Sequence, residues 1–258
     1  MSLVKIEDLR ISLGGRPLVD GVSLEAEAGE IVGLAGESGS GKTLSAMTTL
    51  GFLPAGATAS GSVEVFGEST LTMSPRALRR LRGDRVAAVF QDPMTSLHPM
   101  LSIETQLTEH QRTHRSVTRK QAREHAIELM DLVRIPDPHK AISQYPHQFS
   151  GGMRQRIAIA SALACEPQVL VADEVTTALD VTVQAGILHL LARVREEFSM
   201  AILFITHDLA VMNVLADRLY VMKEGRVVES GPTRDLLADP QDDYSRALVE
   251  ALPQVKED

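Results

Sequence analysis

Short apolar runs alternate with stretches of helical periodicity along most of the chain. Four of these runs predict buried strands, at Ile31–Ala35, Val86–Phe90, Val169–Ala172 and Ala201–Ile205. Ahead of the last run, apolar residues that share one helical face predict a helix: Val183, Ile187, Leu190, Leu191, Val194 and Phe198. Because strands that alternate with helices form mostly parallel sheets covered on both faces, the pattern predicts an α/β fold.

Strands outside this alternation are predicted towards both ends of the chain. Leu3–Glu30 contains short strand-like runs, in which apolar and polar residues alternate as they do in a half-buried strand. Another strand is predicted at Gly61–Phe66, and two more lie within Leu219–Val228 around a turn at Gly225. These segments are expected to extend the sheet structure beyond the four buried runs.

Residues 91–165 have helical character and interrupt the alternation of strands and helices. The clearest helix begins at a capping box formed by Thr118 and Gln121, and Pro136 and Pro138 are predicted to end it. This section therefore predicts a helical subdomain inserted into the α/β core.

The whole chain, residues 1–258, is predicted to be one domain, with the helical subdomain at about 92–165 and a tail at about 232–258. A helix that opens at Ser74-Pro75 is rich in arginine. A solvated face explains it better than a nucleic-acid patch. The arginines concerned are Arg76, Arg79, Arg80, Arg82 and Arg85.

Composition narrows the classes of function. The formal net charge of −8 argues against nucleic acid as the main partner, and the 44% of hydrophobic residues are enough for a sizeable core. Cys165 is the single cysteine, which excludes an internal disulfide and suits a reducing cytosol. We find no secretory leader and no apolar run long enough to cross a bilayer. The chain is therefore expected to be soluble, with any membrane role reached through a partner.

The strongest chemical signal is the phosphate-cradling pattern G-x-x-x-x-G-K-[ST], between the strand Ile31–Ala35 and a helix predicted at Leu44–Leu53. Glycines let the backbone approach a polyphosphate closely. The backbone N–H groups and the positive end of the helix then face its negative charge. Lys42 can reach the β- and γ-phosphates, and the Thr43 hydroxyl can bind Mg²⁺. The phosphate loop comprises Gly36, Glu37, Ser38, Gly39, Ser40, Gly41, Lys42 and Thr43.

Two carboxylates follow the strand Val169–Ala172. In a phosphate-loop NTPase an acid at such a strand end holds Mg²⁺, which here points to Asp173. Glu174 is placed to polarise a water aimed at the γ-phosphate. Taken alone, the pair could be an ordinary surface turn; the phosphate loop makes the nucleotide interpretation the stronger one.

A second anion-binding helix start is predicted at Ser150, Gly151, Gly152 and Met153, where a serine cap precedes two glycines. Taken alone, a capped helix with a flexible start explains it. Since one triphosphate does not need two such termini, two chains could pair head to tail, each closing over the nucleotide of the other.

Together these residues resemble the ATP-binding cassette (ABC) ATPases over essentially the whole chain. Ser150–Met153 looks like the signature loop, which contacts the γ-phosphate across a dimer. Gln91 resembles the glutamine that reaches Mg²⁺ and senses the transmembrane partner. Ala178-Leu179-Asp180 looks like the loop that crosses the dimer interface, and His207 resembles the switch histidine at the γ-phosphate.

The resemblance implies a phosphate-loop (RecA-like) NTPase fold: a mostly parallel sheet core, an amino-terminal antiparallel β part and the helical insert. It also implies ATP and Mg²⁺, with Thr43, Gln91 and Asp173 towards the metal and Glu174 and His207 in catalysis. Expected partners are a second cassette of the same or a related chain, integral membrane permease subunits and, indirectly, a substrate-binding protein.

Two segments are similar to one branch of the family. Phe90–Pro99 resembles the loop of cassette subunits from bacterial peptide and nickel importers, and Asp242–Leu248 resembles the tail of that branch. Longer peptide-type members continue into a cysteine cluster. Because this chain stops near Pro253 and Cys165 lies elsewhere, a metal cluster in the tail is not expected.

The chain departs from the family pattern at three positions. Met153 stands where glutamine is usual, and Val175 where proline usually follows the catalytic glutamate, which leaves that loop less rigid. Leu13 falls near the place of an aromatic residue that stacks on adenine, so a preference for ATP over GTP stays open.

The resemblance therefore predicts an ATPase subunit, held peripherally at the cytoplasmic face of the inner membrane, that drives import of peptides or nickel chelates. A soluble ABC-type ATPase of DNA repair or translation is the alternative, but the sequence lacks the sustained heptads or second cassette of those proteins. A small-molecule kinase would leave Ser150–Met153 and His207 unexplained.

Overall fold

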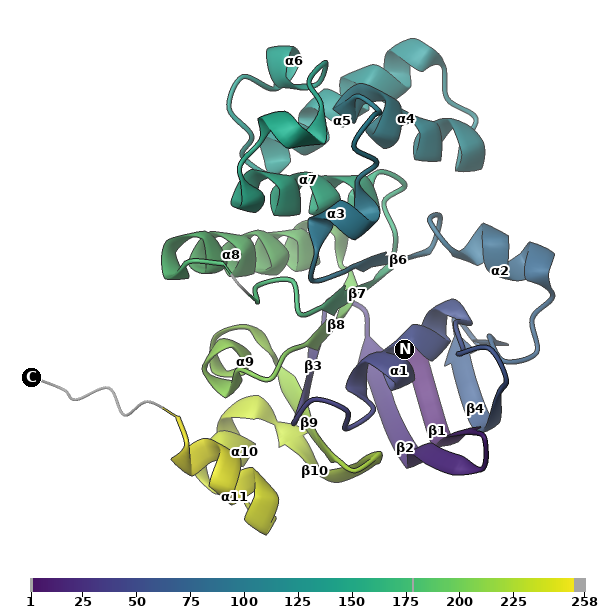
Figure 1. Cartoon of the computed structure of the whole chain (residues 1–258), viewed down its shortest axis with the longest axis vertical. Helices are drawn as coiled ribbons and strands as arrows, with labels where there is room; N and C mark the ends of the chain where they lie inside the picture. Colours follow the sequence, from purple (N-terminus) through teal and green to yellow (C-terminus); the bar gives the residue numbers. More distant parts are fainter. Residues whose placement is uncertain (1, 178, 253–258) are drawn as a thin grey trace, which may run out of the picture. The chain divides into compact units, whose positions relative to one another are not determined.

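The computed structural model describes residues 2–177 and 179–252. Their contacts divide the chain into two units. The first unit is built from residues up to Met73 and from Ala201 onward, and the second from Ser74 to Met200. Figure 1 follows the chain through both.

An antiparallel sheet opens the first unit, with the strand order β2-β1-β4-β5. The prediction of short runs in this region was wrong, because β1 and β2 are strands of 12 residues each. Asp8 and Gly21 adopt positive φ angles of 44° and 80°, and bulges shift the register nearby, so the alternation breaks while the strands continue. The strands are β1 (Ser2–Leu13), β2 (Arg16–Glu27), β4 (Ala57–Val65) and β5 (Glu68–Ser69).

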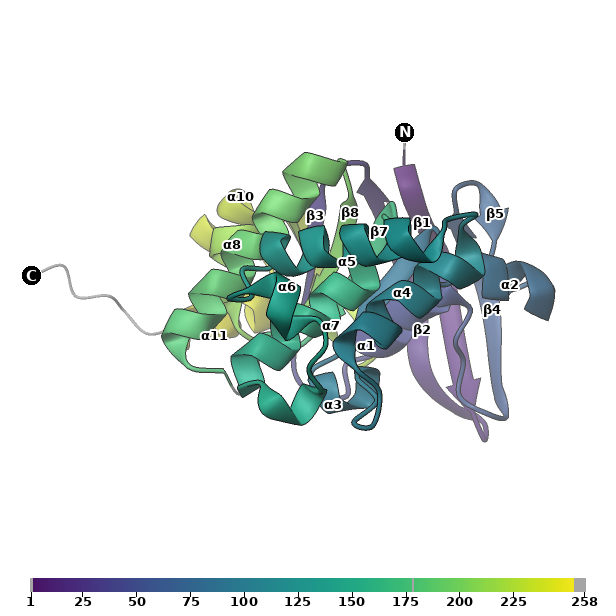
Figure 2. The ribbon, with the colours of Figure 1, turned by 90° about the horizontal axis from the view of Figure 1, so that it is seen from above.

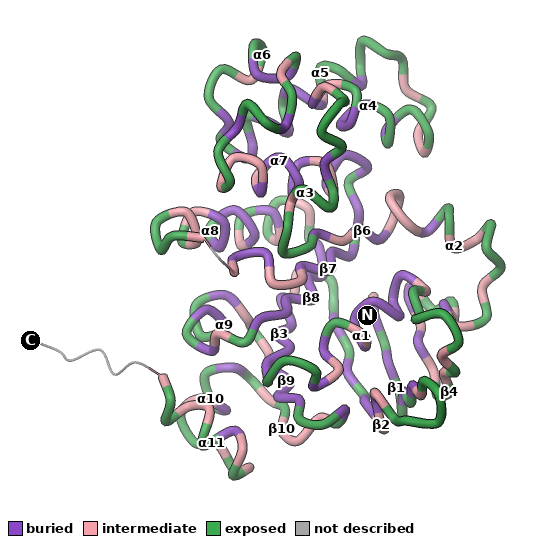
Figure 3. The backbone as a smooth tube through the Cα atoms, in the orientation of Figure 1, coloured by how far each residue is buried: buried purple, intermediate pink, exposed green. Residues whose placement is uncertain are grey.

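The second set of strands in this unit is mostly parallel, in the order β10-β9-β3-β8. β3 pairs in parallel with β8 and β9, and only β10 runs antiparallel, at the edge. β3 and β8 are buried at every residue, as expected of an internal parallel strand (Figure 3). The strands are β3 (Ile31–Ala35), β8 (Ala201–Ile205), β9 (Arg218–Lys223) and β10 (Arg226–Pro232). The predicted strands here are confirmed.

The helix predicted at Leu44–Leu53 is shorter than expected. The α-helix ends at Met47 and tightens into a 3₁₀ turn, where the Thr48 and Thr49 hydroxyls donate to the carbonyls three residues before them. Gly51, at a φ of 67°, then ends the segment. The helical segments of this unit are α1 (Lys42–Met47), η1 (Thr48–Leu50), α9 (Leu209–Leu215), α10 (Thr233–Ala238) and α11 (Asp243–Glu250).

The second unit is mainly helical around one parallel pair of strands, β6 and β7. Its elements are α2 (Pro75–Leu81), β6 (Val86–Val89), α3 (Pro93–Ser96), α4 (Ile103–His114), α5 (Arg119–Leu132), α6 (Pro138–Ala141), η2 (Pro146–Gln148), α7 (Gly151–Leu163), β7 (Val169–Asp173) and α8 (Val181–Phe198). Helices α4 and α5 pack on each other and on α7 (Figure 2). Such a helical section between β6 and β7 agrees with the sequence pattern.

The capping box at the start of α5 is confirmed, since Thr118 and Gln121 exchange hydrogen bonds. The prediction that Pro136 and Pro138 end this helix was wrong. Helix α5 ends at Leu132, and Arg134 then adopts a left-handed conformation with φ of 60°. The chain therefore turns out of the helix before either proline is reached.

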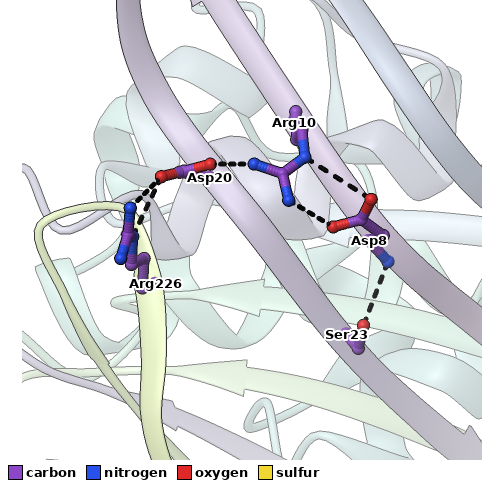
Figure 4. A network of polar contacts seen from close by, with 5 residues as sticks. All are labelled: Asp8, Arg10, Asp20, Ser23 and Arg226. Atoms are coloured by element: carbon purple, nitrogen blue, oxygen red, sulfur yellow. Dashed lines mark hydrogen bonds and ion pairs between the residues drawn. The ribbon is translucent and has the colours of Figure 1, made fainter.

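A chain of charged side chains joins three strands of the first unit (Figure 4). Arg10 on β1 binds Asp8 and Asp20, and Arg226 on β10 donates to Asp20 on β2. The pKa of Asp20 is held below its ordinary value, mainly by Arg226 and to a smaller extent by Arg10, although desolvation alone would raise it. The network fixes the position of β10 relative to the hairpin formed by β1 and β2, next to the turn at Gly225.

Candidate functional site

The phosphate loop joins the end of β3 to the start of α1, as the sequence predicts. Gly36, Gly39 and Gly41 all have positive φ angles, of 138°, 82° and 96°. At Gly36 a Cβ atom would lie 2.0 Å from the Met222 carbonyl oxygen, so only glycine fits there. The sharp backbone turns that the motif needs are therefore present.

Lys42 folds back over the loop. Its Nζ donates to the carbonyl oxygens of Gly36 and Glu37, both at 2.7 Å, and to Ser40 Oγ at 3.3 Å, and the side chain is buried. Gly41 caps α1 without a side-chain hydrogen bond. The ammonium group and the first turn of the helix thus lie on the same loop, in the arrangement that favours a polyphosphate.

Neighbouring segments of the first unit hold the loop. The Gly225 N–H donates to the Ser40 carbonyl at 3.1 Å, and the Asp20 N–H donates to the Gly225 carbonyl at 2.8 Å. On another side, the Glu37 N–H donates to the Tyr244 hydroxyl at 3.0 Å. Sequence reasoning missed Gly225 and Tyr244 as parts of the site, because the distance along the chain hides these contacts.

His207 follows β8 in the first unit and is exposed. Its neighbours are fixed, because the Asp208 N–H donates to Thr206 Oγ1 and Asp208 caps α9 through the N–H groups of Ala210 and Val211. Leu13, at the end of β1, is 39% exposed. An exposed leucine at this point offers an apolar contact to a base but no aromatic ring.

In the second unit, Asp173 is the last residue of β7 and Glu174 follows it, as the sequence predicts. Glu174 has a left-handed φ of 48°, a conformation that costs a non-glycine residue free energy and that recurs at functional sites. The Thr177 N–H donates to the Glu174 carbonyl at 3.0 Å, and Thr177 Oγ1 lies 3.4 Å from Glu174 Oε2. Val175, at the usual place of proline, is buried and anchors the turn by packing.

The serine-capped helix start at Ser150 is confirmed. Ser150 Oγ accepts the Met153 N–H at 3.3 Å, and both Ser150 and Gly151 are exposed. A Cβ atom on Gly151 would meet nothing within 4 Å, whereas one on Gly152 would lie 2.6 Å from Val183 Cγ1. Gly152 is therefore required for packing of α7 against α8, whereas no described residue of the second unit lies close enough to require glycine at position 151.

Asp180 caps α8, where its Oδ1 accepts the Val183 N–H at 3.0 Å. Its side chain is exposed, so this structural role leaves the carboxylate reachable from outside. Of the predicted segment Ala178-Leu179-Asp180, Ala178 lies outside the described residues. The tail predicted to residue 258 is described as far as Leu252.

Gln91, after β6, is exposed and lies beside contacts to α7. Gln155 Nε2 donates to the Phe90 carbonyl at 3.3 Å, and Arg154 Nη1 lies 3.6 Å from Met94 Sδ. Both partners come from the helix that Ser150 starts. The Gln91 segment and that helix are therefore linked inside the second unit.

The candidate residues thus divide between the units. The phosphate loop, Leu13 and His207 belong to the first unit, and Gln91, Ser150–Met153, Asp173, Glu174 and Asp180 belong to the second. The side chains expected towards Mg²⁺ offer a hydroxyl, an amide oxygen and a carboxylate, which are the hard oxygen ligands that this ion takes. Among residues 2–177 and 179–252, no His, Cys, Asp and Glu cluster forms a metal site of its own.

Comparisons with known proteins agree on one family. The family model described as "ABC transporter" matches residues 19–177. The probable peptide ABC transporter ATP-binding protein y4tR of Sinorhizobium fredii is 44% identical over 97% of this chain and 77% of its own length. The oligopeptide transport ATP-binding protein OppD of Escherichia coli is 41% identical over 98% of this chain and 77% of its own.

Solved structures give the same answer for the fold. CbiO1 from Clostridium perfringens, part of the ABC transporter complex cbiONQ, matches with a TM-score of 0.80 and 26% identity over 92% of this chain and 91% of that one. The dimeric cassette MJ0796, in a post-hydrolysis state bound to ADP and Pi, matches with a TM-score of 0.78 and 27% identity over 90% and 99%.

No helix in the described part of the chain is long and apolar enough to span a membrane. The phosphate loop, the strand that ends in two acids, the serine-capped helix start and the comparisons all point to one conclusion. The chain belongs to the ABC transporter family and is one of its ATP-binding, ATP-hydrolysing cassettes.

Proposed function

We propose that this cassette powers import of peptides by hydrolysing ATP between two opposed cassettes. The observation that carries the proposal is a pair of candidate anion-binding elements on one chain: the phosphate loop that Lys42 covers, and the exposed Ser150 helix start with open space at Gly151. Relatives named as peptide or oligopeptide transport proteins support peptides rather than nickel chelates as the cargo.

In the first unit, Lys42 is assigned to the β- and γ-phosphates. On binding nucleotide, its ammonium exchanges the carbonyls of Gly36 and Glu37 for phosphate oxygens. Thr43 is assigned as an oxygen ligand for Mg²⁺, which would neutralise phosphate charge when bound. His207, exposed after β8, is assigned to the γ-phosphate.

In the second unit, Asp173 and Gln91 are each assigned as oxygen ligands for Mg²⁺, and Glu174 as the group that orients and deprotonates the attacking water. Glu174 has a left-handed backbone conformation directly after β7, so the chain leaves the extended path of the strand at this residue. Hydrolysis then releases phosphate and requires no acceptor group from another substrate.

The second cassette supplies the remaining contacts. Ser150, Gly151 and Gly152 are assigned to the γ-phosphate held by the opposite chain, and Asp180 to the interface between the chains. The MJ0796 relative is described as a dimer with ADP and Pi, which supports this arrangement. Binding at the γ-phosphate favours a closed pair of cassettes, and its loss releases them.

The membrane permease is proposed to bind the second unit beside Gln91. The segment of chain from Phe90 to Leu101 exposes large apolar side chains: Phe90, Met94, Met100 and Leu101, of which Met100 is 76% exposed. Exposed apolar groups suit a partner helix. Through Gln155 and Arg154, this surface is linked to the helix that Ser150 starts. Such docking places the chain peripherally at the cytoplasmic face of the membrane.

The experiment measures inorganic phosphate released from Mg·ATP by the wild type, with Lys42→Ala as the control that lacks the phosphate contact. Phosphate release that Lys42→Ala abolishes supports the hydrolase, and ATP consumption that needs a phosphorylated acceptor would favour a kinase. Membrane proteins that co-purify with the chain then test the transport role. Co-purification with ribosomes or DNA-repair proteins alone would support the soluble alternative.

A further inference from the structure

The tail of the first unit is anchored firmly before α11 begins. Glu229 on β10 accepts the N–H groups of Gln241 at 2.8 Å and Asp242 at 3.2 Å. Partial burial alone would raise the pKa of Glu229, but the Gln241 N–H, the Ser245 hydroxyl and the Asp242 N–H hold it below its ordinary value, so the carboxylate stays charged. Asp242 then caps α11 by accepting the Tyr244 N–H at 2.9 Å. These contacts set the direction in which Tyr244 leaves the helix.

Tyr244 reaches from this anchored helix to the phosphate loop. Its hydroxyl accepts the Glu37 N–H at 3.0 Å, and the Lys223 ammonium lies 4.9 Å from the centre of its ring. Burial raises the pKa of Tyr244 further above neutral pH, so the hydroxyl stays protonated. The Glu37 N–H is therefore hydrogen-bonded to the tail, through Tyr244.

The loop is consequently held at two points by the carboxyl-terminal part of the first unit. Tyr244 holds the Glu37 N–H, and the Gly225 N–H holds the Ser40 carbonyl at 3.1 Å. Glu37 and Ser40 flank Ser38 and Gly39, so the loop is fixed on both sides of its tip. A loop that is already ordered loses less conformational entropy when it binds a phosphate.

We propose that Tyr244 is a positioning residue for nucleotide binding, which holds the phosphate loop in its binding shape from the tail helix α11. The proposal rests on the proposed function, in which this loop binds ATP. It makes α11 part of the nucleotide site of the first unit, although no side chain of α11 is assigned to the nucleotide itself.

Tyr220 offers a matched control. Its hydroxyl accepts a backbone N–H, that of Glu25, at 3.3 Å, and its ring lies 5.6 Å from the Arg218 guanidinium carbon. Tyr220→Phe and Tyr244→Phe therefore remove the same kind of contact. Only the second contact touches the phosphate loop.

The test titrates a fluorescent ATP analogue against the full chain and measures KM and kcat for ATP. Tyr244→Phe is expected to weaken binding and raise KM by about 2- to 10-fold, the effect of one hydrogen bond, with kcat unchanged. Tyr220→Phe is expected to leave both constants at the wild-type value. Glu229→Ala, which frees the tail, should shift KM in the same direction as Tyr244→Phe.

Two failures can be told apart. If the wild type binds no nucleotide, or if Lys42→Ala binds as well as the wild type, the proposed function fails. If the wild type binds and Lys42→Ala does not, but Tyr244→Phe binds as tightly as Tyr220→Phe, only the role of Tyr244 is refuted. Equal losses in both tyrosine variants would also refute it, because they would reflect general destabilisation.

Discussion

Gly151 and Gly152 are adjacent at the start of α7, and the structure predicts opposite outcomes when each becomes alanine. An added Cβ at Gly151 meets nothing within 4 Å, and its φ is not positive. An added Cβ at Gly152 would lie 2.6 Å from Val183 Cγ1. A glycine without a packing reason, exposed beside a serine cap, is explained if another molecule must approach it closely.

For Gly151→Ala, stability should rise by about 0.5 kcal/mol, because alanine has less freedom in the unfolded chain and favours helix. This corresponds to roughly 1–2 °C in the unfolding temperature. ATP turnover should nevertheless fall by roughly 10- to 100-fold, because in the proposed dimer the new methyl group would displace the γ-phosphate held by the opposite chain. Stability and activity therefore change in opposite directions.

The assay combines urea unfolding with phosphate release on the same preparations. Gly152→Ala serves as the contrast: it should lose about 1–3 kcal/mol by overpacking, and adding Val183→Ala should restore much of that loss. Wild-type turnover in Gly151→Ala would refute the role of this glycine at the dimer. A loss of stability in Gly151→Ala would refute the reading of open space around it.

Three further outcomes are expected. Glu174→Gln should lower turnover by about 10²- to 10⁴-fold while ATP still binds; near-normal turnover would remove Glu174 from catalysis. Burial raises the pKa of Cys165 to about 11, so thiol reagents should label the unfolded chain and spare the native one. Rapid labelling of the native chain would contradict this prediction. Because Arg226 and Arg10 lower the pKa of Asp20 in the folded chain, the stability they add is fully present well above pH 3.8, the ordinary pKa, and is lost as the pH falls through the lowered pKa. The difference in urea midpoint between wild type and Asp20→Asn should therefore shrink from pH 7 to pH 2, and a constant difference would contradict the network.

Local signals in the sequence predicted the features that depend on local physics. The buried runs at β3, β7 and β8, the capping box at Thr118 and the serine cap at Ser150 each involve residues a few positions apart. The spacing of the glycines identified the phosphate loop. Such features need no knowledge of which distant segments meet.

What the sequence could not predict depends on contacts between distant segments. The need for glycine at position 36 arises from the Met222 carbonyl, and Tyr244 reaches the loop across 207 positions of the chain. Strand lengths in the amino-terminal part were underestimated because the bulge at Asp8 breaks the alternation by which strands are recognised. Left-handed Arg134 ended α5 earlier than the prolines suggested.

The central claim is that each nucleotide site takes residues from two chains, and mixing two inactive variants tests it most directly. Lys42→Ala lacks the phosphate contact, and Ser150→Arg blocks the contribution to the opposite chain. Mixed in equal amounts, they should form heterodimers with one intact site, restoring about a quarter of wild-type phosphate release when sites act independently. Phosphate release that stays at the level of the separate variants, although heterodimers form, would contradict the claim.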